Sequence, residues 1–429
     1  MNPSSQQPEL KDRDRAHGWH PFTQMAAWDD PAFSPVVIER GEGVWLWDTE
    51  GRRYLDGNSS IWTNLHGHGH PAIVEAIARQ ARQLDHSSFL GYTHPRAIEL
   101  AERLCGFFPA GTLERCFFSD NGSTAIEVAL KLAIQYRQQN GEPERTGFAS
   151  FANAYHGDTL GAASLGGVTT FFERFAAFGL QPERVRDLAD LQRLDASQLT
   201  AVIIEPLIQG VNRMTPWPSG MLRELRAWCT QHDVFLILDE VMTGFGRTGT
   251  LFACQQEDIL PDFLCLAKGL TGGTLPLAAT LTTPRLYQGF LGGPDRTFYY
   301  GHSYCANPLG CAAALASLDL FEKEQTLEHL PAKIERLRQG RLALEARHPE
   351  VLATRQCGFM AGIDLALDGA SFCRRLLGHG LLTRPIGDTV VLLPPLAIDL
   401  EELDFAFAAL SSALTSPPPT AEVKALPDH

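Results

Sequence analysis

Val234-Phe235-Leu236-Ile237-Leu238-Asp239-Glu240 decides the fold of this chain, because an unbroken apolar run ends directly in two acidic residues. A short apolar run of this kind is typical of a strand that is buried on both faces, as in a parallel sheet. Similar runs occur at 116–118, 201–204 and 263–266, and helical patterns separate them. Buried strands that alternate with helices predict an α/β fold with a mainly parallel sheet.

The segments on either side of this region predict a second, smaller domain. Near the N-terminus, short β-rich runs are broken by glycines, which favours a small antiparallel meander. Residues 1–18 and 415–429 have the composition of loose ends. We expect residues 1–65 to form the N-terminal part of a smaller α+β domain and residues 66–310 to form a large α/β domain. Residues 311–429 are expected to form a linking helix and the rest of the smaller domain.

The composition restricts the classes of protein to which the chain can belong. Of its 429 residues 44% are hydrophobic, which is enough for a large core and excludes disorder for most of the chain. The 50 acidic and 36 basic side chains give a net charge of −14, so we expect neither nucleic acid nor a membrane as a partner. The N-terminal residues 1–15 are polar, so we expect no secretory signal, and the sequence shows no apolar run of about 18 residues and no C-x-x-C pair. We expect a cytoplasmic protein that acts on small molecules.

Four polar features follow predicted strands, where open α/β sheets bind ligands. Asp120-Asn121-Gly122-Ser123-Thr124 precedes a helix and could hold a phosphate, or serve as an ordinary N-cap. Asp239 could hold a protonated ring nitrogen or a metal, or cap a helix. Lys268 could form a Schiff base if its amine is desolvated, or extend to the surface. Tyr155-His156-Gly157-Asp158 offers an aromatic face beside a carboxylate, or is a plain loop.

Taken together, the four features are more specific than any one of them. A phosphate cradle, an aromatic plate, an acid for a pyridine nitrogen and a Schiff-base lysine are the parts that a pyridoxal 5′-phosphate (PLP) site requires. The acid would keep the ring nitrogen protonated, and the lysine would first hold the aldehyde and later move a proton. The sequence therefore predicts PLP as the cofactor.

Two competing patterns lead to other functions. Gly244-Phe245-Gly246-Arg247-Thr248-Gly249 matches the dinucleotide-binding motif G-x-G-x-x-G, but it does not open a clear amphipathic helix directly after a strand. His66-Gly67-His68-Gly69-His70 could place three imidazoles together in a metal-dependent hydrolase, or form a tight turn before the next helix. We expect no metal site here.

The chain resembles the class III, or ω-type, aminotransferases. The residues that carry this resemblance are Leu238-Asp239-Glu240-Val241, Gly244-Phe245-Gly246-Arg247-Thr248-Gly249 and Lys268-Gly269 with Gly272-Gly273. The resemblance implies the PLP-dependent transferase fold type I, with a large domain around a mainly parallel sheet and a smaller α+β domain from both chain ends. It also implies a homodimer with shared active sites.

Within this family the chain resembles the branch that serves biotin synthesis. The residues concerned are Trp19-His20-Pro21-Phe22-Thr23, Asp56-Gly57-Asn58-Ser59-Ser60-Ile61-Trp62, His66-Gly67-His68, Tyr155-His156-Gly157-Asp158-Thr159 and Thr383-Arg384-Pro385. The resemblance implies a ping-pong aminotransferase that converts 8-amino-7-oxononanoate to 7,8-diaminononanoate. The alternatives are another ω-aminotransferase, acting on ornithine, GABA or a diamine, and a non-catalytic protein of the same fold.

The resemblance also implies roles for individual residues. Lys268 is implied as the Schiff-base lysine and proton shuttle, Asp239 as the partner of the pyridinium nitrogen, and Tyr155 as the stacking ring. The other implied cofactor contacts are Asn121, Gly122, Ser123, Asp158, Glu205, and, from the partner subunit, His302 and Ser303. The implied substrate contacts, besides Tyr155 and Lys268, are Phe22, Ile61, Trp62, Gly301 and Arg384. Arginine suits a substrate carboxylate because its planar fork can bind both oxygens.

The amino donor is predicted from three positions at which this chain differs from the family members that use S-adenosylmethionine. Members that use S-adenosylmethionine typically have Tyr at the position of Phe22, Trp at that of Ile61, and Gly-Pro-Thr in place of Gly301-His302-Ser303. Phe22 lacks a hydroxyl that could orient a polar substrate, and Ile61 lacks an aromatic surface for a sulfonium or an adenine. The same departures resemble a branch that uses L-lysine, and we favour L-lysine over S-adenosylmethionine.

Overall fold

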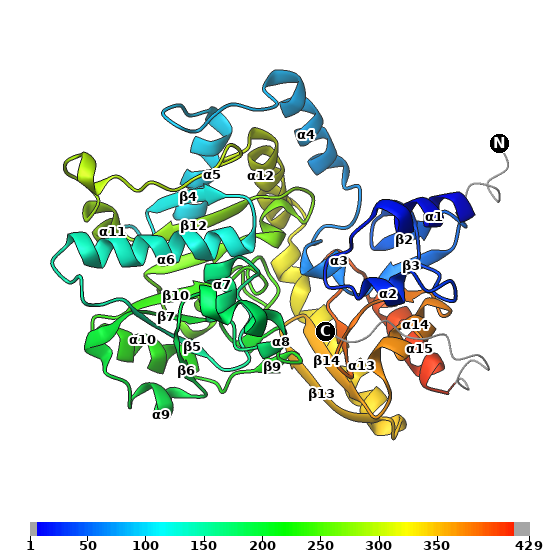
Figure 1. Ribbon diagram of the computed structural model, residues 1–429. Helices are drawn as coiled ribbons and strands as arrows, with labels where there is room; N and C mark the ends of the chain where they lie inside the picture. The colour runs from blue at the N-terminus through cyan, green and yellow to red at the C-terminus, as the bar shows by residue number, and fades with distance from the viewer. Residues whose placement is uncertain (1–6, 416–429) are drawn as a thin grey trace. The chain divides into compact units, whose positions relative to one another are not determined.

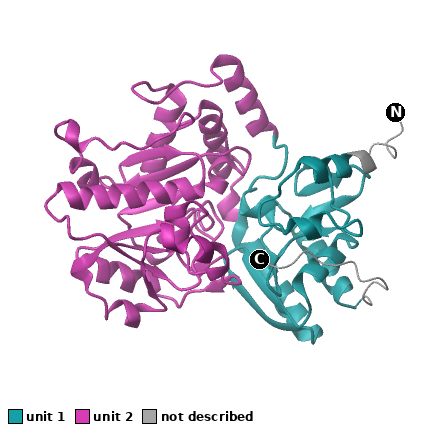
Figure 2. Cartoon of the chain, viewed as in Figure 1, with its two compact units in different colours: residues 1–70, 329–429 teal, residues 71–328 magenta. Residues whose placement is uncertain are grey.

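The chain folds into two compact units. The computed structural model describes residues 7–415, and unit 1 comprises residues 1–70 and 329–429 while unit 2 comprises residues 71–328 (Figure 2). Within residues 7–415, no helix combines the length and the apolar character that crossing a membrane would need.

Unit 2 is built on a seven-stranded sheet with the order β4-β12-β11-β10-β7-β5-β6. The strands, in that order, are Arg115–Ser119, Ala278–Thr282, Phe263–Leu266, Phe235–Asp239, Leu199–Ile204, Gly147–Phe151 and Glu183–Val185. Strand β12 pairs antiparallel with both β11 and β4, and all other pairs in the sheet are parallel. The predicted α/β fold with a mainly parallel sheet is therefore confirmed.

Helix α6 (Gly122–Gln139) lies across this sheet (Figure 1). Its small apolar residues Ala125, Ala129 and Ala133 pack in one buried cluster with Phe235 and Phe263 of β10 and β11. Small side chains let the helix approach the strands closely, and burial of the aromatic rings supplies much of the apolar area. The other α-helices of unit 2 are α4 (Pro71–Gln83), α5 (Pro95–Gly106), α7 (Leu160–Leu165), α8 (Thr169–Phe172), α9 (Leu188–Leu191), α10 (Met221–Gln231), α11 (Pro284–Gln288) and α12 (Pro308–Lys323).

Unit 1 contains two small sheets. In the first, β1 (Ile38–Glu42), β2 (Trp45–Asp48) and β3 (Arg53–Asp56) form the expected antiparallel meander, and β15 (Leu381–Leu382) adds a parallel edge to β3. The second sheet is antiparallel, with the order β13 (Val351–Cys357), β14 (Met360–Leu365), β17 (Thr389–Leu392) and β16 (Pro385–Ile386).

The helices of unit 1 correct one expectation about the chain ends. They are α1 (Gln7–His17), α2 (Met25–Trp28), α3 (Ser59–Trp62), α14 (Gly369–Leu377), α15 (Leu400–Thr415) and most of α13 (Thr326–Arg347). The prediction that residues 1–18 form a loose end is wrong for residues 7–17, because they form α1. Hydrogen bonds from Arg15 to the carbonyls of Trp28 and Phe33 attach this polar helix to the chain that follows. Residues 416–429 of the other predicted loose end lie outside the described residues.

Candidate active site

The carboxyl ends of five strands bring polar residues to one edge of the sheet in unit 2. Asp239 ends β10 opposite Cys265 of β11, and Lys268 follows β11 by two residues. Glu205 directly follows β7 and Tyr155 follows β5, both of which run parallel to β10. The loop after β4 adds Asp120 and the start of α6. Because parallel strands share the direction of their carboxyl ends, residues from 120 to 268 meet at a single edge.

Two hydrogen bonds fix the carboxylate of Asp239. Its Oδ2 lies 2.8 Å from His156 Nδ1, and its Oδ1 accepts a hydrogen bond from the Val241 N–H at 3.1 Å. Since a carboxylate only accepts, Nδ1 of the imidazole is the donor. Nε2 of His156 is buried without a hydrogen-bond partner among the described residues. Asp239 is itself buried, so the two hydrogen bonds fix its orientation in a nearly dry setting.

Lys268 occupies a strained backbone position beside these acids. Its φ is +46°, which is rare for a residue with a side chain. Burial lowers the pKa of its amine, while the charges of Asp239 and Glu205 act in the opposite direction. The amine therefore gives up its proton more readily than an exposed lysine, as a nucleophile or a proton acceptor requires.

Glu205 is a buried acid that holds the loop of Tyr155. Its Oε1 accepts from the Tyr155 N–H at 3.0 Å and its Oε2 from the Gly210 N–H at 2.9 Å. Burial raises the pKa of Glu205 to about 7. The Tyr155 hydroxyl donates to Asp158 Oδ2 at 2.5 Å, and burial together with this bond raises the pKa of Tyr155. Tyr155 is thus a neutral aromatic ring that is tethered at both its backbone and its hydroxyl.

The N-terminus of α6 forms a cradle for an anion. Asn121 caps the helix, because its Oδ1 accepts from the Thr124 N–H at 3.0 Å while Thr124 Oγ1 accepts from the Asn121 N–H at 3.1 Å. Ser123 Oγ accepts from the Asp158 N–H at 3.0 Å. A Cβ at Gly157, whose φ is +115°, would lie 2.1 Å from Ser123 Oγ, so only glycine fits there. The ordinary N-cap is therefore present, and the N–H groups at the start of α6 are the candidate phosphate cradle.

The segment 301–305 lies beside this cradle within the same chain. His302 Nε2 is 3.7 Å from Asp120 Oδ1, and His302 Nδ1 accepts from the Tyr304 N–H at 3.2 Å. Gly301 has a φ of +152°, and Ser303 is exposed.

The remaining predicted substrate residues belong to unit 1. Phe22 and Ile61 are exposed and both have positive φ, whereas Trp62 is buried. Arg384 is half-buried in the chain between β15 and β16, and its carbonyl accepts from the Val391 N–H at 3.3 Å. The structure therefore gathers the predicted cofactor contacts in unit 2 and places these four side chains in unit 1.

The two competing motifs have other roles in the structure. Both ring nitrogens of His68 are engaged, Nε2 by Asp56 Oδ2 at 3.0 Å and Nδ1 by Asn64 Nδ2 at 3.1 Å. Across residues 7–415, no group of three or more His, Cys, Asp or Glu could hold a metal ion. The glycine-rich segment after β10 forms turns, and Glu240 anchors the chain beyond it by accepting from the N–H groups of Ala253 and Cys254 at 2.6 and 2.8 Å. Neither motif supports a hydrolase or a dinucleotide site.

Comparison with known proteins assigns the chain to a family. The model of the class III aminotransferases matches residues 25–414. The chain belongs to the class III aminotransferases. It is 44% identical to the adenosylmethionine-8-amino-7-oxononanoate aminotransferase of Geobacter sulfurreducens (94% of this chain, 97% of that protein) and 47% identical to that of Nitratidesulfovibrio vulgaris (94% and 80%).

Solved structures of aminotransferases have the same fold. The adenosylmethionine-8-amino-7-oxononanoate aminotransferase of Methanocaldococcus jannaschii matches with a TM-score of 0.91 and 38% identity over 95% of this chain and 98% of that one. An amine transaminase from an uncultivated Pseudomonas species, solved with PLP bound, matches with a TM-score of 0.88 and 32% identity over 92% and 98%. This aminotransferase is therefore a PLP-dependent enzyme of fold type I.

The residues of this aminotransferase fit PLP. The cradle at the start of α6 leaves no room for a Cβ at residue 157, and its backbone N–H groups suit a phosphate. A fixed carboxylate at Asp239 suits a protonated pyridine nitrogen, and an amine of lowered pKa at Lys268 suits an aldehyde. His156 was missed from the sequence as a site residue, although its position directly after Tyr155 in a strand-end loop was the available signal.

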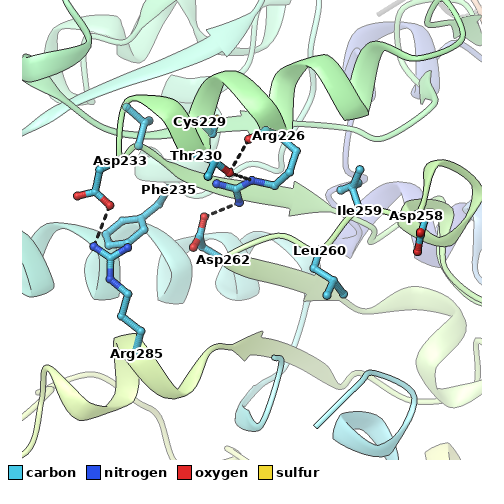
Figure 3. A pocket seen from close by; sticks show the side chains of 11 residues that line it. Arg226, Cys229, Thr230, Asp233, Phe235, Asp258, Ile259, Leu260, Asp262 and Arg285 are labelled. Atoms are coloured by element: carbon cyan, nitrogen blue, oxygen red, sulfur yellow. Dashed lines mark hydrogen bonds and ion pairs between the residues drawn. The ribbon is translucent and has the colours of Figure 1, made fainter. Parts of the chain in front are cut away.

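A cavity of about 460 Å³ lies at the opposite, amino ends of β10 and β11 of the aminotransferase (Figure 3). Two arginines enter it, and each is paired with an aspartate of the lining: Arg226 with Asp262 and Arg285 with Asp233, both at 2.8 Å. Both arginines are therefore neutralised within the lining, and Asp258 is the charged lining residue outside these two pairs. The candidate catalytic residues lie at the other edge of the sheet.

Proposed function

We propose that this aminotransferase transfers an amino group to 8-amino-7-oxononanoate and so forms 7,8-diaminononanoate for biotin synthesis. The observation that carries the proposal is that Asp239, Lys268 and the α6 cradle meet at one sheet edge, in a chain 44% identical over 94% of its length to a relative named for this substrate. Arg384 supports it, because a guanidinium can bind the carboxylate of a long monocarboxylate substrate.

The geometry of the site supports a role for each of several residues of the chain. Bound PLP supplies an electron sink for the carbon that bears the amino group. Asp239, held by His156 and Val241, keeps a proton on the pyridine nitrogen. The N–H groups at the start of α6 and the hydroxyl of Ser123 bind the phosphate.

Proton transfer and orientation fall to two further residues. Lys268 Nζ, with its lowered pKa, takes a proton from the donor carbon and later returns one to the acceptor carbon. Tyr155 holds the ring plane, because Glu205 fixes its backbone and Asp158 fixes its hydroxyl.

We also propose that the enzyme is a homodimer with shared active sites. Large side chains of unit 2 are exposed in two segments, Leu90 (72%) and Tyr92 (73%) in one and Tyr299 (84%) and Tyr304 (60%) in the other. The rings of His86 and Tyr304 lie 4.9 Å apart, so the two segments are neighbours. An exposed apolar surface of this kind is typical of an interface. His302 and Ser303 lie in the second segment, so they would be at the interface of this dimer.

The proposed amino donor is L-lysine. Phe22 presents no hydroxyl that could orient a polar donor, and Ile61 presents an exposed aliphatic side chain instead of an aromatic surface on which a sulfonium or an adenine could rest. The relatives from Geobacter and Nitratidesulfovibrio are named for adenosylmethionine, so the donor requires a direct test. The free cysteines suit a reducing compartment, and we propose the cytoplasm as the location.

One experiment tests both substrate and donor. Purified enzyme loaded with PLP is incubated with 8-amino-7-oxononanoate and a single donor, and 7,8-diaminononanoate is measured by mass spectrometry. Turnover is expected with L-lysine alone. Turnover with S-adenosylmethionine and none with L-lysine would overturn the donor assignment. Activity on ornithine, GABA or a diamine without any on 8-amino-7-oxononanoate would overturn the proposed function.

A further inference from the structure

Four consecutive residues in unit 1 adopt a left-handed backbone. Ser59, Ser60, Ile61 and Trp62 have φ values of +46°, +46°, +68° and +67°, and none of them is glycine. A side chain in this region of backbone space is unfavourable, and runs of such residues are rarer still. The turn persists only where the surrounding structure holds it.

The buried carboxylate of Asp56 is the principal support of this turn. Its Oδ1 accepts from the N–H groups of Asn58 and Ser60 at 3.3 and 3.0 Å, and its Oδ2 accepts from the Ser60 hydroxyl at 2.8 Å. The residue is completely buried, so these bonds face no competition from water. Asp56 thus binds both the backbone and the side chain at the centre of the turn.

His68 supports the same carboxylate from a second piece of chain. Its Nε2 lies 3.0 Å from Asp56 Oδ2, and its Nδ1 is held by Asn64. The backbone of His68 is paired with Gly43 in both directions, at 3.1 and 2.6 Å. The imidazole is therefore a fixed partner that orients Asp56 rather than a mobile surface group.

The turn determines how two neighbouring side chains are presented. Trp62 is pinned, because its indole N–H donates to Asn58 Oδ1 at 2.8 Å, and only 8% of the residue is exposed. Ile61 points outward and is 47% exposed. The turn is also tied to the strand region at the other end of unit 1, since the Ser59 hydroxyl donates to the Leu393 carbonyl at 2.7 Å.

We propose that Asp56 and His68 are positioning residues that set substrate specificity, by holding Ile61 and Trp62 in a left-handed turn against the aliphatic chain of the amino acceptor. The inference rests on the proposed function and on the expectation that Ile61 and Trp62 contact the substrate. Neither Asp56 nor His68 touches substrate or cofactor in this account. Their effect is on substrate affinity, exerted through the shape of the turn.

The test uses the PLP-loaded enzyme and a rescue by glycine. Asp56→Ala should raise KM for 8-amino-7-oxononanoate by about tenfold while kcat changes little, because a small misplacement of a contact weakens binding. Adding Ser60→Gly should restore much of this loss, since glycine adopts a positive φ without penalty and the lost hydroxyl bond is already absent. His68→Gln, which keeps a donor near Asp56, should lie closer to wild type than His68→Leu.

A matched control comes from the same meander. Asp48 is also buried and accepts hydrogen bonds, from Arg52 and Tyr54, but it does not contact the turn. Asp48→Ala should lower the melting temperature without changing KM for the acceptor. Amide hydrogen exchange over residues 58–64 should speed up in Asp56→Ala, slow again in the double variant, and stay unchanged in the control.

The outcomes separate this inference from the proposed function. If Asp56→Ala leaves KM and amide exchange unchanged, or if Ser60→Gly gives no rescue, the inference is overturned. If the wild type ignores 8-amino-7-oxononanoate but aminates another acceptor, the proposed function fails, and the same KM shift and rescue measured on that acceptor decide the positioning role. A third outcome is that amide exchange speeds up in Asp56→Ala and slows again in the double variant, while KM is unchanged for every acceptor. That outcome overturns the specificity role.

Discussion

His156 donates from Nδ1 to Asp239 Oδ2 at 2.8 Å, and its other ring nitrogen is buried without a hydrogen-bond partner among the described residues. The imidazole thus directs its one hydrogen bond to one oxygen of Asp239, the acid that we propose as the partner of the pyridine nitrogen. The Val241 N–H binds the other oxygen, so the orientation of the acid depends on both bonds.

The first prediction concerns this pair. His156→Leu should lower kcat/KM by about 10- to 100-fold, which corresponds to about 1.4 to 2.7 kcal/mol. The reason is that the Asp239 carboxylate is no longer held in a fixed orientation by the imidazole. His156→Asn, which keeps an N–H near the position of Nδ1, should recover part of the loss. Steady-state kinetics, together with the pH dependence of the cofactor absorbance, provide the measurement. Equal activity of His156→Leu and the wild type would contradict the positioning role.

A second prediction concerns the lysine. Wild-type enzyme should be yellow, and Lys268→Ala should convert the bound absorbance to that of free or loosely held cofactor. Activity should fall by at least roughly 10²- to 10⁴-fold, the usual contribution of a positioned proton-transfer group. Absorbance spectra before and after gel filtration give the first readout, and turnover of 8-amino-7-oxononanoate gives the second. A colourless wild type that cannot be reconstituted with PLP would refute the site.

A third prediction isolates the close contact in the phosphate cradle. Gly157→Ala should cost about 1 to 3 kcal/mol from its positive φ, and more from the contact with Ser123 Oγ. Gly141→Ala is the matched control, since Gly141 has a φ of +92° but a Cβ there meets no atom within 4 Å. Chemical denaturation and PLP titration should show that only Gly157→Ala also weakens cofactor binding. If both variants lose similar stability and neither changes the affinity for PLP, Ser123 does not contribute to phosphate binding.

A fourth prediction follows from the buried acid Glu205. Burial raises its pKa from 4.5 to about 7, so the folded state favours the protonated form. The stability that this group contributes is complete below pH 4.5 and is lost as the pH rises through 7, on the order of 3 kcal/mol in total. In cofactor-free protein, the free energy of unfolding of wild type should fall relative to that of Glu205→Gln between pH 5 and 8, measured by urea denaturation at each pH. A constant difference between the two proteins would show that the pKa is not raised.

The fifth prediction exchanges the residues that favour L-lysine. Phe22→Tyr with Ile61→Trp restores a hydroxyl and an aromatic surface, and should shift the ratio of kcat/KM toward S-adenosylmethionine by about tenfold or more. The kinetics of the two donors, each measured alone, provide the test. Asp48→Ala serves as a control for a general loss of stability in unit 1. No change in the donor ratio would remove these two residues from donor selection.

The candidate site residues at the carboxyl ends of the strands in unit 2 are predictable from sequence, because their positions depend on local patterns. The apolar runs that end in Asp239 and Lys268 coincide with β10 and β11, and Asn121 stands at the start of α6 as a capping residue does. Strand β13 was not predicted, because its short apolar start, Val351-Leu352-Ala353, is followed by three polar residues, so that no apolar run spans the strand.

Other features depend on contacts between distant parts of the chain. No local signal marks Ser59 to Trp62 as left-handed, because the conformation is imposed by Asp56 and, through it, by His68. The same dependence explains why the histidine-rich motif suggested a metal: a sequence pattern does not show that His68 already has partners on both nitrogens. His156 was missed as a site residue because its acceptor lies 83 positions away in sequence.

The two ends of strand β10 differ in how freely the residues around them can be substituted. Its first residue, Phe235, lines the cavity that contains the two arginine–aspartate pairs, whereas its last residue, Asp239, lies at the opposite edge of the sheet, where we propose that the cofactor binds. An engineer can therefore screen cavity-filling substitutions around Ile259 and Leu260 for heat resistance, and separately screen the turn around Ile61 for new substrates. Because the two libraries lie in different units, we expect their gains to add, so that a robust variant can serve as the parent for any later change of specificity.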